Sequence, residues 1–525
     1  DTEGNNIKNV KYAQTFLPNA PSYNFVDNLN ANIILRNNGQ LFVATTNDYQ
    51  PLKYENGSPV KNVDEVRCGF YNILMTFLDE EVRYTPTPSP SKTITPTKTP
   101  SMSKSQSHTK TPDTWNPTIF NGSYHYGRFG ISVATNEDGT SFIAGGSGQS
   151  SYTHDYATGM GQNWHQGHAR VYHKNSNGIF VMKGTDILAS KPDTGTTGKE
   201  SVGKCVDMSA DGNIIAVGSP SYAHNSDSTI LGRVRVFEWN GGAWQQKGGD
   251  LFHSGGSATE HCGNSVALSA DGTICAFSVD VDQDGKDHIG GISVCKFNGT
   301  SWVQYAPLIV LTDWNEGGFR PYVRMSDNGD RLVVAMRNKQ NNNALAHNGL
   351  VQTYRKTSSG YTKHKQYSDT NAYYFGWGKG VDISGDGNTI SIGVAWKDKT
   401  NISNGGKVGI YGWNSSSPYQ TIDSDDRYFG QSVALNKDGT KLIVGSKPLT
   451  PTDAGKVQIY KRPHPTAQFA LQFEEHSNKV GMTLGQNVAI SKDGNFAISG
   501  NPDDTVMNAV NTPDGGSVRV YEWGI

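Results

Sequence analysis

The sequence predicts an all-β protein: a seven-bladed β-propeller preceded by a small β domain and by an extended linker rich in Ser, Thr and Pro. Two observations predict the propeller. A segment with the pattern of a β-hairpin recurs seven times after residue 113, and repetition of this kind is typical of propeller blades. Glycine is abundant, at 60 residues, and long amphipathic helical stretches are missing. Such a composition favours short strands joined by tight turns.

Each copy of the repeat is an alternating strand, a turn ending in Gly and a second apolar strand, which together are a strong hairpin signal. Four copies are close to one another: 202–220, 262–278 (CGNSVALSADGTICAFS), 428–448 (YFGQSVALNKDGTKLIVGSKP) and 484–502. Three are looser: 128–146, 320–335 and 377–393. The turns of the seven copies are marked by Asp138, Asp211, Asp271, Asn328, Asp386, Asp438 and Asp493.

A variable connection follows each hairpin and leads to a third strand, such as GRVRVFEW (232–239) or GKVGIYGW (406–413). A short turn then leads to a fourth strand, as at 243–246. Four antiparallel strands in a period of roughly 55 residues describe one propeller blade. The aromatic residues that end the third strands are predicted to pack between blades, rather than to form a glycan platform: Trp239, Phe297, Trp413 and Trp523.

The pattern F-G-x-S-V-x-x-S-x-D-G…V-G-x-P resembles the FG-GAP repeats of integrin-α-type propellers. The resemblance spans roughly residues 115–525, in seven in-phase copies. It implies a seven-bladed propeller that acts in adhesion or recognition. It is specific for the fold and weak for activity, because one fold serves many functions.

The ring is predicted to close by pairing residues 115–120 with 516–523. The seventh repeat stops at GSVRVYEWGI, so it has no fourth strand of its own, whereas the segment before the first repeat has the right length. Closure hides two sheet edges, and Pro117 suits an outermost strand because it lacks an N–H. The sequence leaves open whether the strand comes from the same chain, which we favour, or from a neighbouring copy.

Residues 1–84 are predicted to form a small β domain or an assembly segment. The stretches 32–44 and 71–84 each have the pattern of two strands around a polar turn. Residues 63–77 (VDEVRCGFYNILMTF) distantly resemble an RCC1-type repeat, within a region of similar character from 26 to 84. Two such units cannot close a propeller by themselves.

The linker spans residues 85–112 and consists mainly of Ser, Thr, Pro and Lys. Flexible tethers share this composition, but so do O-glycosylated stalks, and we favour an extended, glycosylated stalk. Its four lysines fall six residues apart, at 92, 98, 104 and 110, which places them on one face of a polyproline II helix. The candidate O-glycosylation sites are Thr87, Ser89, Thr93, Thr95, Thr97, Thr99, Ser101 and Ser103.

Asn-x-Ser/Thr sequences mark candidate N-glycosylation sites at Asn121, Asn298, Asn401 and Asn414. A fifth sequence, at Asn56, is weakened by the following Ser58-Pro59. Several such sequences arise by chance in a chain rich in Asn and Ser. Asn298 and Asn414 are predicted to lie in exposed hairpin turns and are therefore the most accessible.

An acidic run, DVDQDGKDH, begins at Asp280. Alternating carboxylates followed by Gly can converge on Ca²⁺, so the candidate calcium ligands are Asp280, Asp282, Asp284 and Asp287. The run departs from the integrin-type loop, because its ninth position is His288 and because it follows a strand instead of preceding one. A solvated acidic turn is the alternative interpretation, and Ca²⁺ is the only candidate cofactor.

The connection at 147–173, in the first repeat, is rich in His and aromatic residues. We expect a contact surface for protein or sugar there, carried by Tyr152, His154, Trp164, His165 and His168. Zn²⁺ binding by His165 and His168 is the weaker interpretation, since no Cys or carboxylate follows at matching spacing.

The five cysteines are an odd number, too few for a disulfide scaffold, and their pairing stays open: Cys68, Cys205, Cys262, Cys275 and Cys295. Cys275 and Cys295 are expected to be neighbours on the second and third strands of one blade. They form either a disulfide or two buried thiols.

The charge is nearly balanced, with 46 basic and 48 acidic residues. Neither nucleic acid nor an anionic membrane is therefore expected as a partner, and no apolar run is long enough to span a bilayer. The usual catalytic motifs are missing. We expect a non-enzymatic, extracellular or cell-surface glycoprotein that self-assembles into a homo-oligomer, fibre or coat. An adhesion module is the alternative, and a carbohydrate-active enzyme is the third class.

Overall fold

The computed structural model describes five short segments of the N-terminal region and most of the chain after residue 116. The described residues are 32–35, 41–45, 48–51, 63–69, 72–77, 117–123, 127–148, 166–190, 200–222, 230–253, 259–283, 286–311, 319–337, 349–369, 373–376, 379–396, 405–426, 428–446, 455–477, 483–504 and 515–523. The chain divides into two units, Asp1–Lys104 and Ser105–Ile525. No helix in the described part is long and apolar enough to cross a membrane.

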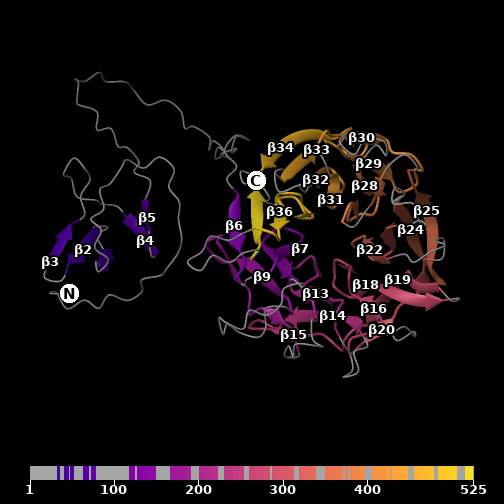
Figure 1. Ribbon diagram of the computed structural model, residues 1–525, viewed down its shortest axis with the longest axis horizontal. Helices are drawn as coiled ribbons and strands as arrows, with labels where there is room; N and C mark the ends of the chain where they lie inside the picture. The colour runs from indigo at the N-terminus through magenta and orange to yellow at the C-terminus, as the bar shows by residue number, and fades with distance from the viewer. Residues whose placement is uncertain are drawn as a thin grey trace, which may run out of the picture. The chain divides into compact units, whose positions relative to one another are not determined.

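The second unit is a seven-bladed β-propeller, which Figure 1 shows as a ring of sheets around an axis. The first three blades run from the inside outward through four antiparallel strands and carry one extra short strand each. Blade 1 comprises β7 (Phe129–Thr135), β8 (Ser141–Gly146), β9 (His168–Lys174), β10 (Phe180–Met182) and β11 (Ile187–Leu188). Blade 2 comprises β12 (Cys205–Met208), β13 (Ile214–Ser219), β14 (Ile230–Trp239), β15 (Trp244–Gln246) and β16 (Thr259–Cys262). Blade 3 comprises β17 (Val266–Leu268), β18 (Ile274–Gln283), β19 (Lys286–Phe297), β20 (Trp302–Gln304) and β21 (Ile309–Val310).

The next three blades repeat the same order, with the innermost strand of blade 5 split in two. Blade 4 comprises β22 (Phe319–Met325), β23 (Arg331–Arg337), β24 (Gly349–Thr357) and β25 (Gly360–Tyr367). Blade 5 comprises β26 (Tyr373–Phe375), β27 (Val381–Ile383), β28 (Thr389–Trp396), β29 (Lys407–Gly412) and β30 (Gln420–Asp423). Blade 6 comprises β31 (Phe429–Leu435), β32 (Lys441–Ser446), β33 (Lys456–Lys461) and β34 (Ala470–His476).

Blade 7 is built from both ends of the unit. Its first three strands are β35 (Asn487–Ile490), β36 (Phe496–Asn501) and β37 (Ser517–Glu522), and its outermost strand is β6 (Thr118–Asn121). β6 pairs antiparallel with β37, with Phe120 opposite Val518. The strand that the sequence suggested for closure therefore lies in the expected sheet.

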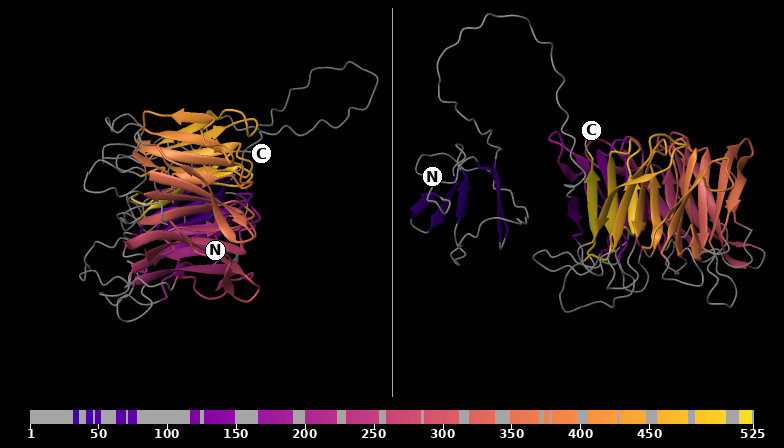
Figure 2. Two further views of the ribbon diagram at one scale, coloured as in Figure 1. Left: turned by 90° about the vertical axis from the view of Figure 1, so that its right-hand side faces the viewer. Right: turned by 90° about the horizontal axis from the view of Figure 1, so that it is seen from above.

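The antiparallel order gives the propeller two distinct faces, between which the strands run in Figure 2. The turn between the first and second strands of a blade lies on one face, which we call the turn face. The connection between the second and third strands lies on the opposite face, which we call the loop face. The long variable connections predicted from the sequence all leave from the loop face, because they follow second strands.

Large apolar side chains fill the spaces between blades, as between blades 7 and 1. Phe129 and Phe142 of blade 1 pack with Phe496 and Val518 of blade 7, and all four are almost inaccessible. Phe120 of β6 completes this cluster, since its ring lies 4.7 Å from Tyr172 and 5.2 Å from Phe142. Closure of the ring is therefore also closure of an apolar core.

The Phe-Gly dipeptide of the repeat has a backbone explanation. Gly130 follows Phe129 with φ at +92°, a conformation that favours glycine. Its carbonyl oxygen lies where a side chain at Gly500 of the neighbouring blade would begin, only 2.0 Å from an ideal Cβ. Glycine is required at both positions because the two blades approach each other through backbone.

In the first unit, β1 (Asn32–Leu35), β2 (Leu41–Thr45) and β3 (Asp48–Pro51) form an antiparallel sheet, and β4 (Val63–Gly69) pairs with β5 (Asn72–Phe77). The hairpin expected at 32–44 corresponds to β1 and β2. The second hairpin is shifted relative to the prediction: β5 takes its partner from 63–69, with Gly69 opposite Asn72. Residues 63–69 lie within the repeat resemblance, and no strand is predicted there from the sequence.

Candidate functional site in the axial channel

The seven innermost hairpin turns meet around the propeller axis through backbone hydrogen bonds. Each turn has the sequence Ser/Asn-x-Asp/Asn-Gly, and the carbonyl of its x residue accepts a hydrogen bond from the turn of the preceding blade. The bonds form a closed ring: Glu137 N to Ala210 O (2.9 Å), Ala210 N to Ala270 O (2.8 Å), Ala270 N to Asp327 O (2.8 Å), Asp327 N to Gly385 O (2.8 Å), Asp386 N to Lys437 O (2.8 Å), Lys437 N to Lys492 O (2.9 Å) and Asp493 N to Glu137 O (3.0 Å). The ring joins all seven blades on the turn face.

The turns are themselves rigid, because the side chain at their first position both donates and accepts a hydrogen bond within the hairpin. In blade 2, Ser209 Oγ donates to Asp211 Oδ1 (2.6 Å) and accepts from Ile214 N (2.9 Å). These bonds lower the pKa of Asp211 against the opposing effect of burial, which is the largest single influence. Blades 3, 5 and 7 repeat the arrangement. The ring therefore rests on turns whose geometry the sequence fixes locally.

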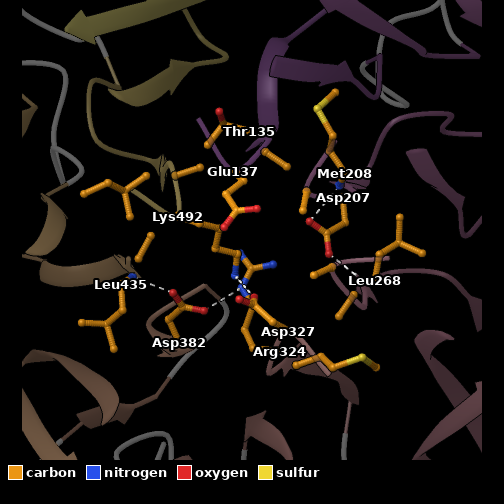
Figure 3. A pocket seen from close by; sticks show the side chains of 18 of the residues that line it. Thr135, Glu137, Asp207, Met208, Leu268, Arg324, Asp327, Asp382, Leu435 and Lys492 are labelled. Atoms are coloured by element: carbon orange, nitrogen blue, oxygen red, sulfur yellow. Dashed lines mark hydrogen bonds and ion pairs between the residues drawn. The ribbon is translucent and has the colours of Figure 1, made fainter. Parts of the chain in front are cut away.

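A cavity of about 80 Å³ lies behind this ring on the axis, with room for a few water molecules. Its lining includes small side chains from neighbouring blades, such as Ala210, Ala267 and Ala270. Charged residues from five blades also enter it, and Figure 3 shows them grouped around Arg324 and Lys492. They are Glu137, Asp207, Arg324, Asp327, Asp382 and Lys492.

Two ion pairs join non-adjacent blades at the turn-face end of the cavity. Lys492 Nζ of blade 7 lies 2.8 Å from Asp327 Oδ1 of blade 4, so this pair crosses the channel. Lys437 Nζ of blade 6 lies 2.7 Å from Glu137 Oε1 of blade 1, and both of these side chains are about half exposed. Burial would lower the pKa of Lys492, but Asp327, Asp382 and Asp207 outweigh it and raise that pKa above its ordinary value.

Deeper in the cavity, Arg324 is the central cation. Its Nε lies 3.6 Å from Asp382 Oδ1, while the other oxygen of Asp382 accepts a 2.7 Å hydrogen bond from Leu435 N of the next blade. Burial raises the pKa of Asp382, and Arg324 opposes that rise. Burial would likewise lower the pKa of Arg324, but Tyr322 and the carboxylates raise it.

Asp207 of blade 2 occupies the position equivalent to Asp382. Its Oδ2 accepts a 2.7 Å hydrogen bond from Leu268 N of blade 3, and its Oδ1 accepts one of 2.9 Å from Met208 N. Burial raises the pKa of Asp207, with Arg324 acting against it. The two aspartates thus make the same contact between a blade and its successor, as Figure 3 shows.

On the loop-face side of this cluster, Lys379 of blade 5 reaches across to blade 1. Its Nζ donates a 2.6 Å hydrogen bond to the carbonyl of Ile131, which also accepts a 2.6 Å bond from Asn487 Nδ2 of blade 7. Burial lowers the pKa of Lys379 to about 7, against the opposing influence of Cys205. Side chains of blades 5 and 7 thus meet at one backbone carbonyl of blade 1.

The arrangement is suited to holding blades together. The charged side chains named above bind one another or backbone groups, and each contact joins different blades except that of Asp207 with Met208. Among the described residues, no three His, Cys, Asp or Glu side chains gather closely enough to hold a metal ion.

Of the candidate calcium ligands, only Asp280 has a described side chain. It is buried, at 3% exposure, and its Oδ2 lies 3.3 Å from His261 Nδ1. Asp282 and Asp287 belong to the long hairpin β18–β19, in which Asp280 lies opposite Gly290, and Asp284 lies outside the described residues. The acidic run therefore begins in β18 and ends in β19, the two strands of one hairpin. The calcium site stays a prediction.

Of the predicted contact loop, only His168 is described. It begins β9, is 2% exposed and stacks on Phe129 at 5.7 Å between ring centroids. Burial lowers its pKa to about 4, against the opposing charge of Asp186. His168 is thus part of the packing of blade 1, while the other four residues of that set lie outside the described residues: Tyr152, His154, Trp164 and His165.

Three candidate N-glycosylation sites are described, and all three are exposed: Asn121, Asn298 and Asn414. Asn121 ends β6 opposite Ser517. Asn298 lies in the turn between β19 and β20, where its Oδ1 accepts hydrogen bonds from Thr300 N (3.0 Å) and Ser301 N (2.9 Å). Asn56, Asn401 and every O-glycosylation candidate of the linker lie outside the described residues.

The four described cysteines are buried free thiols: Cys205, Cys262, Cys275 and Cys295. Cys275 and Cys295 lie directly opposite each other in the register of β18 and β19. They are therefore cross-strand neighbours, as expected from the sequence. Burial raises the pKa of both thiols, which lowers their reactivity.

The aromatic residues at the ends of the third strands pack between blades, as predicted. Lys183 Nζ of blade 1 lies 5.4 Å from the ring centroid of Trp239, and Lys247 Nζ of blade 2 lies 4.6 Å from that of Phe297. Trp413 stacks on His364 of blade 4 at 4.8 Å. Nearby, Trp244 Nε1 donates a 2.7 Å hydrogen bond to Lys183 O, and Trp302 repeats this bond with Lys247.

Sequence reasoning missed the charged cavity, although a signal for it exists. Aligned at the second residue of Val-x-x-Ser/Asn, the innermost strands carry Ala in four blades but Asp207, Arg324 and Asp382 in the other three. An innermost strand faces the axis with every second residue. Charges at that position therefore meet near the axis, even though each strand alone looks like an ordinary repeat.

No family model matches the sequence, and no curated protein matches it either. Solved structures with similar folds include a chain of the mitotic checkpoint complex (11% identity, 85% of this chain and 99% of that chain covered, TM-score 0.45). Others are a putative 6-phosphogluconolactonase from Bacteroides uniformis (13%, 68% and 91%, TM-score 0.40) and a hypothetical selenium-binding protein from Sulfolobus tokodaii (9%, 67% and 82%, TM-score 0.44). With TM-scores below 0.5, none of these likenesses carries an argument about function.

Proposed function

We propose that the protein is a non-enzymatic structural glycoprotein, a self-assembling subunit of an extracellular fibre, surface appendage or coat. The proposal rests on the contacts that the charged side chains of the axial cavity make between blades. In it, Lys492 binds Asp327 across the axis, and Arg324, Asp382 and Lys379 join further blades. These polar groups bind other blades and so hold the ring closed, which suits a rigid building block.

The ring is closed both at the axis and at the rim, and this double closure supports the same function. The backbone ring joins the blades at the axis, and β6 joins blades 7 and 1 at the rim. A fibre subunit must resist mechanical load, and a propeller without closure could open between its first and last blades. Load applied through the linker would reach the ring at β6, because residues 85–112 directly precede it.

The glycan component of the proposal rests on the linker composition and on two exposed turns. Asn298 uses Oδ1 to cap its own turn, while the side chain as a whole stays exposed. Attachment of a sugar at Nδ2 would leave those hydrogen bonds in place. Asn414 is exposed at the corresponding turn of blade 5.

An adhesion or recognition module is the second candidate, and the FG-GAP resemblance favours it. The connections after second strands all leave from the loop face, including the one that carries Tyr152, His154, Trp164 and His165. Binding loops gathered on one face of a rigid scaffold are a common arrangement for recognition. In this alternative Ca²⁺ bound near Asp280 would stabilise the hairpin of blade 3.

Sedimentation velocity and mass spectrometry on native protein test the proposal together. We expect species far heavier than the 57.0 kDa chain, and hexose or pentose additions on the 85–112 peptide. A protein that is monomeric at all concentrations and carries no sugar on that peptide would contradict the proposal. A monomer that binds immobilised glycans or cells would favour adhesion.

A further inference from the structure

Two outermost strands differ from the others in length. Among the described residues, β25 has 8 residues and β34 has 7, whereas the outermost strands of the other five blades have 3 or 4. Both strands end their sheets, with no further strand paired outside them in the described part of the chain. Long unpaired edges are uncommon in proteins that stay monomeric, because their free N–H and C=O groups can pair with another chain.

The outward backbone groups of β34 can be assigned from its register. Ser477 N donates to Gly455 O (2.8 Å), and Lys456 lies opposite His476 in the next pair. Because antiparallel pairs alternate between bonded and non-bonded, the N–H groups of Glu474 and His476 point away from β33. They face the rim of the propeller, where a strand from another molecule could accept their hydrogen bonds.

The two edges differ in the charged residues that they contain. β25 contains Lys363, His364 and Lys365 and no acid, and Lys363 is exposed. β34 contains Glu474, Glu475 and His476 and neither Lys nor Arg, although Lys456 and Arg519 of neighbouring strands pair with Glu474 and Glu475. It also exposes Leu471 at 48%. Opposite charges on facing strands stabilise pairing and like charges oppose it. Two β25 edges therefore repel each other, whereas β34 offers carboxylates to the lysines of β25.

We propose that β25 of one molecule pairs with β34 of a second copy of this chain. The pairing names the contact by which the protein polymerises, so it rests on the proposed function. Because the two strands lie on different blades, the contact is heterologous and each molecule keeps one free edge of each kind. Blades 4 and 6 are two steps apart, or roughly 103° around a seven-bladed ring. Because every added copy presents one free edge of each kind, further copies can add in the same way and the assembly can extend into a filament.

The electrostatic part of the contact is tested with two charge-changed variants of the full chain. Lys363→Glu with Lys365→Glu makes both edges acidic, and Gln472→Lys with Glu474→Lys makes both edges basic. We expect either variant alone to sediment as a monomer at concentrations where the wild type polymerises. An equimolar mixture should polymerise again, with alternating copies, and raised salt should weaken it. The matched control, Val303→Glu with Gln304→Glu, changes the short edge of β20 and should polymerise as the wild type does.

The backbone part is tested at His476. His476→Pro removes an outward N–H without removing a bond to β33, and His476→Ala keeps that N–H while losing the same imidazole. We expect the proline variant to lower the extent of polymerisation at least tenfold and the alanine variant to leave it within twofold. Thermal unfolding of every variant checks that the propeller is intact.

The outcomes separate the pairing from the proposed function. Polymers of wild type that persist in both charge variants and in His476→Pro would overturn the β25–β34 contact and leave the structural function standing. A wild-type protein that never polymerises, in purified or native form, would overturn both. Loss of polymers in each charge variant with recovery on mixing is the result that only the proposed contact predicts.

Discussion

The backbone N–H of Asp493 donates a 3.0 Å hydrogen bond to the carbonyl oxygen of Glu137, and this bond joins the last turn of the propeller to the first. It completes a ring of backbone hydrogen bonds at the axis, while β6 completes the seventh sheet at the rim. The two closures hold the same pair of blades at different radii. Stability of the whole ring should therefore depend on residues at both places.

At the rim, Phe120→Ala should lower the free energy of unfolding by about 2–4 kcal/mol, because it removes a ring packed on Phe142, Tyr172 and Phe180. The neighbouring Ile119 is 50% exposed on the same strand, so Ile119→Ala should cost less than about 1 kcal/mol. Urea denaturation of both variants measures the difference. Equal costs would mean that β6 does not hold the ring through its inner face.

At the axis, Lys492 and Asp327 should be energetically coupled. A double-mutant cycle with Lys492→Gln and Asp327→Asn is expected to give about 1–3 kcal/mol, since the pair is largely buried and crosses the channel. The cycle with Lys437→Gln and Glu137→Gln serves as the control. That pair is about half exposed and should give no more than about 1 kcal/mol. Equal coupling energies in the two cycles would contradict the assigned role of the channel pair.

The pH dependence of stability should carry a contribution from Lys379. Burial holds its pKa at about 7 in the folded protein, compared with an ordinary value of 10.5. Between these values the unfolded chain binds a proton that the folded protein does not, so stability rises as pH increases from 7 towards 10.5. Lys379→Met should flatten this part of the profile of melting temperature against pH. A variant profile parallel to that of the wild type would show that Lys379 stays charged.

Glycosylation can be tested at matched turns. Asn298→Gln should remove one N-glycan from protein made in a eukaryotic secretory host, as a single step in intact mass. Asn240 occupies the equivalent turn of blade 2, with Oδ1 bonded to Gly242 N and Ala243 N, but it is followed by Gly-Gly. Gly242→Thr completes the acceptor sequence there and should add one glycan. No gain at Asn240 and no loss at Asn298 would mean that these turns are not modified.

The fold was predictable because the sequence signals of its hairpins are local and recur in every blade. Turn residues such as Asp211-Gly212 mark each inner hairpin, and the number of copies gives the number of blades. The missing fourth strand of the last repeat also pointed to the segment that contains Phe120. The second N-terminal hairpin pairs 63–69 with 72–77 and not the two halves of 71–84. It was misplaced because the spacing of Val63 and Val66 does not have the period of a strand.

The candidate site could not be predicted in the same way. Asp207, Arg324 and Asp382 lie far apart in the sequence, and only ring closure brings them to one axis. His168 was expected in an exposed contact surface, but it is buried in blade 1. Burial and convergence across blades are tertiary properties, whereas hairpin turns are local ones.

Electron microscopy of the native material tests the central claim most directly. The account predicts filaments or a regular coat whose repeating unit is a seven-bladed propeller, with neighbouring propellers in rim-to-rim contact. Isolated propellers with no ordered contacts, at the concentration found in the native source, would contradict it.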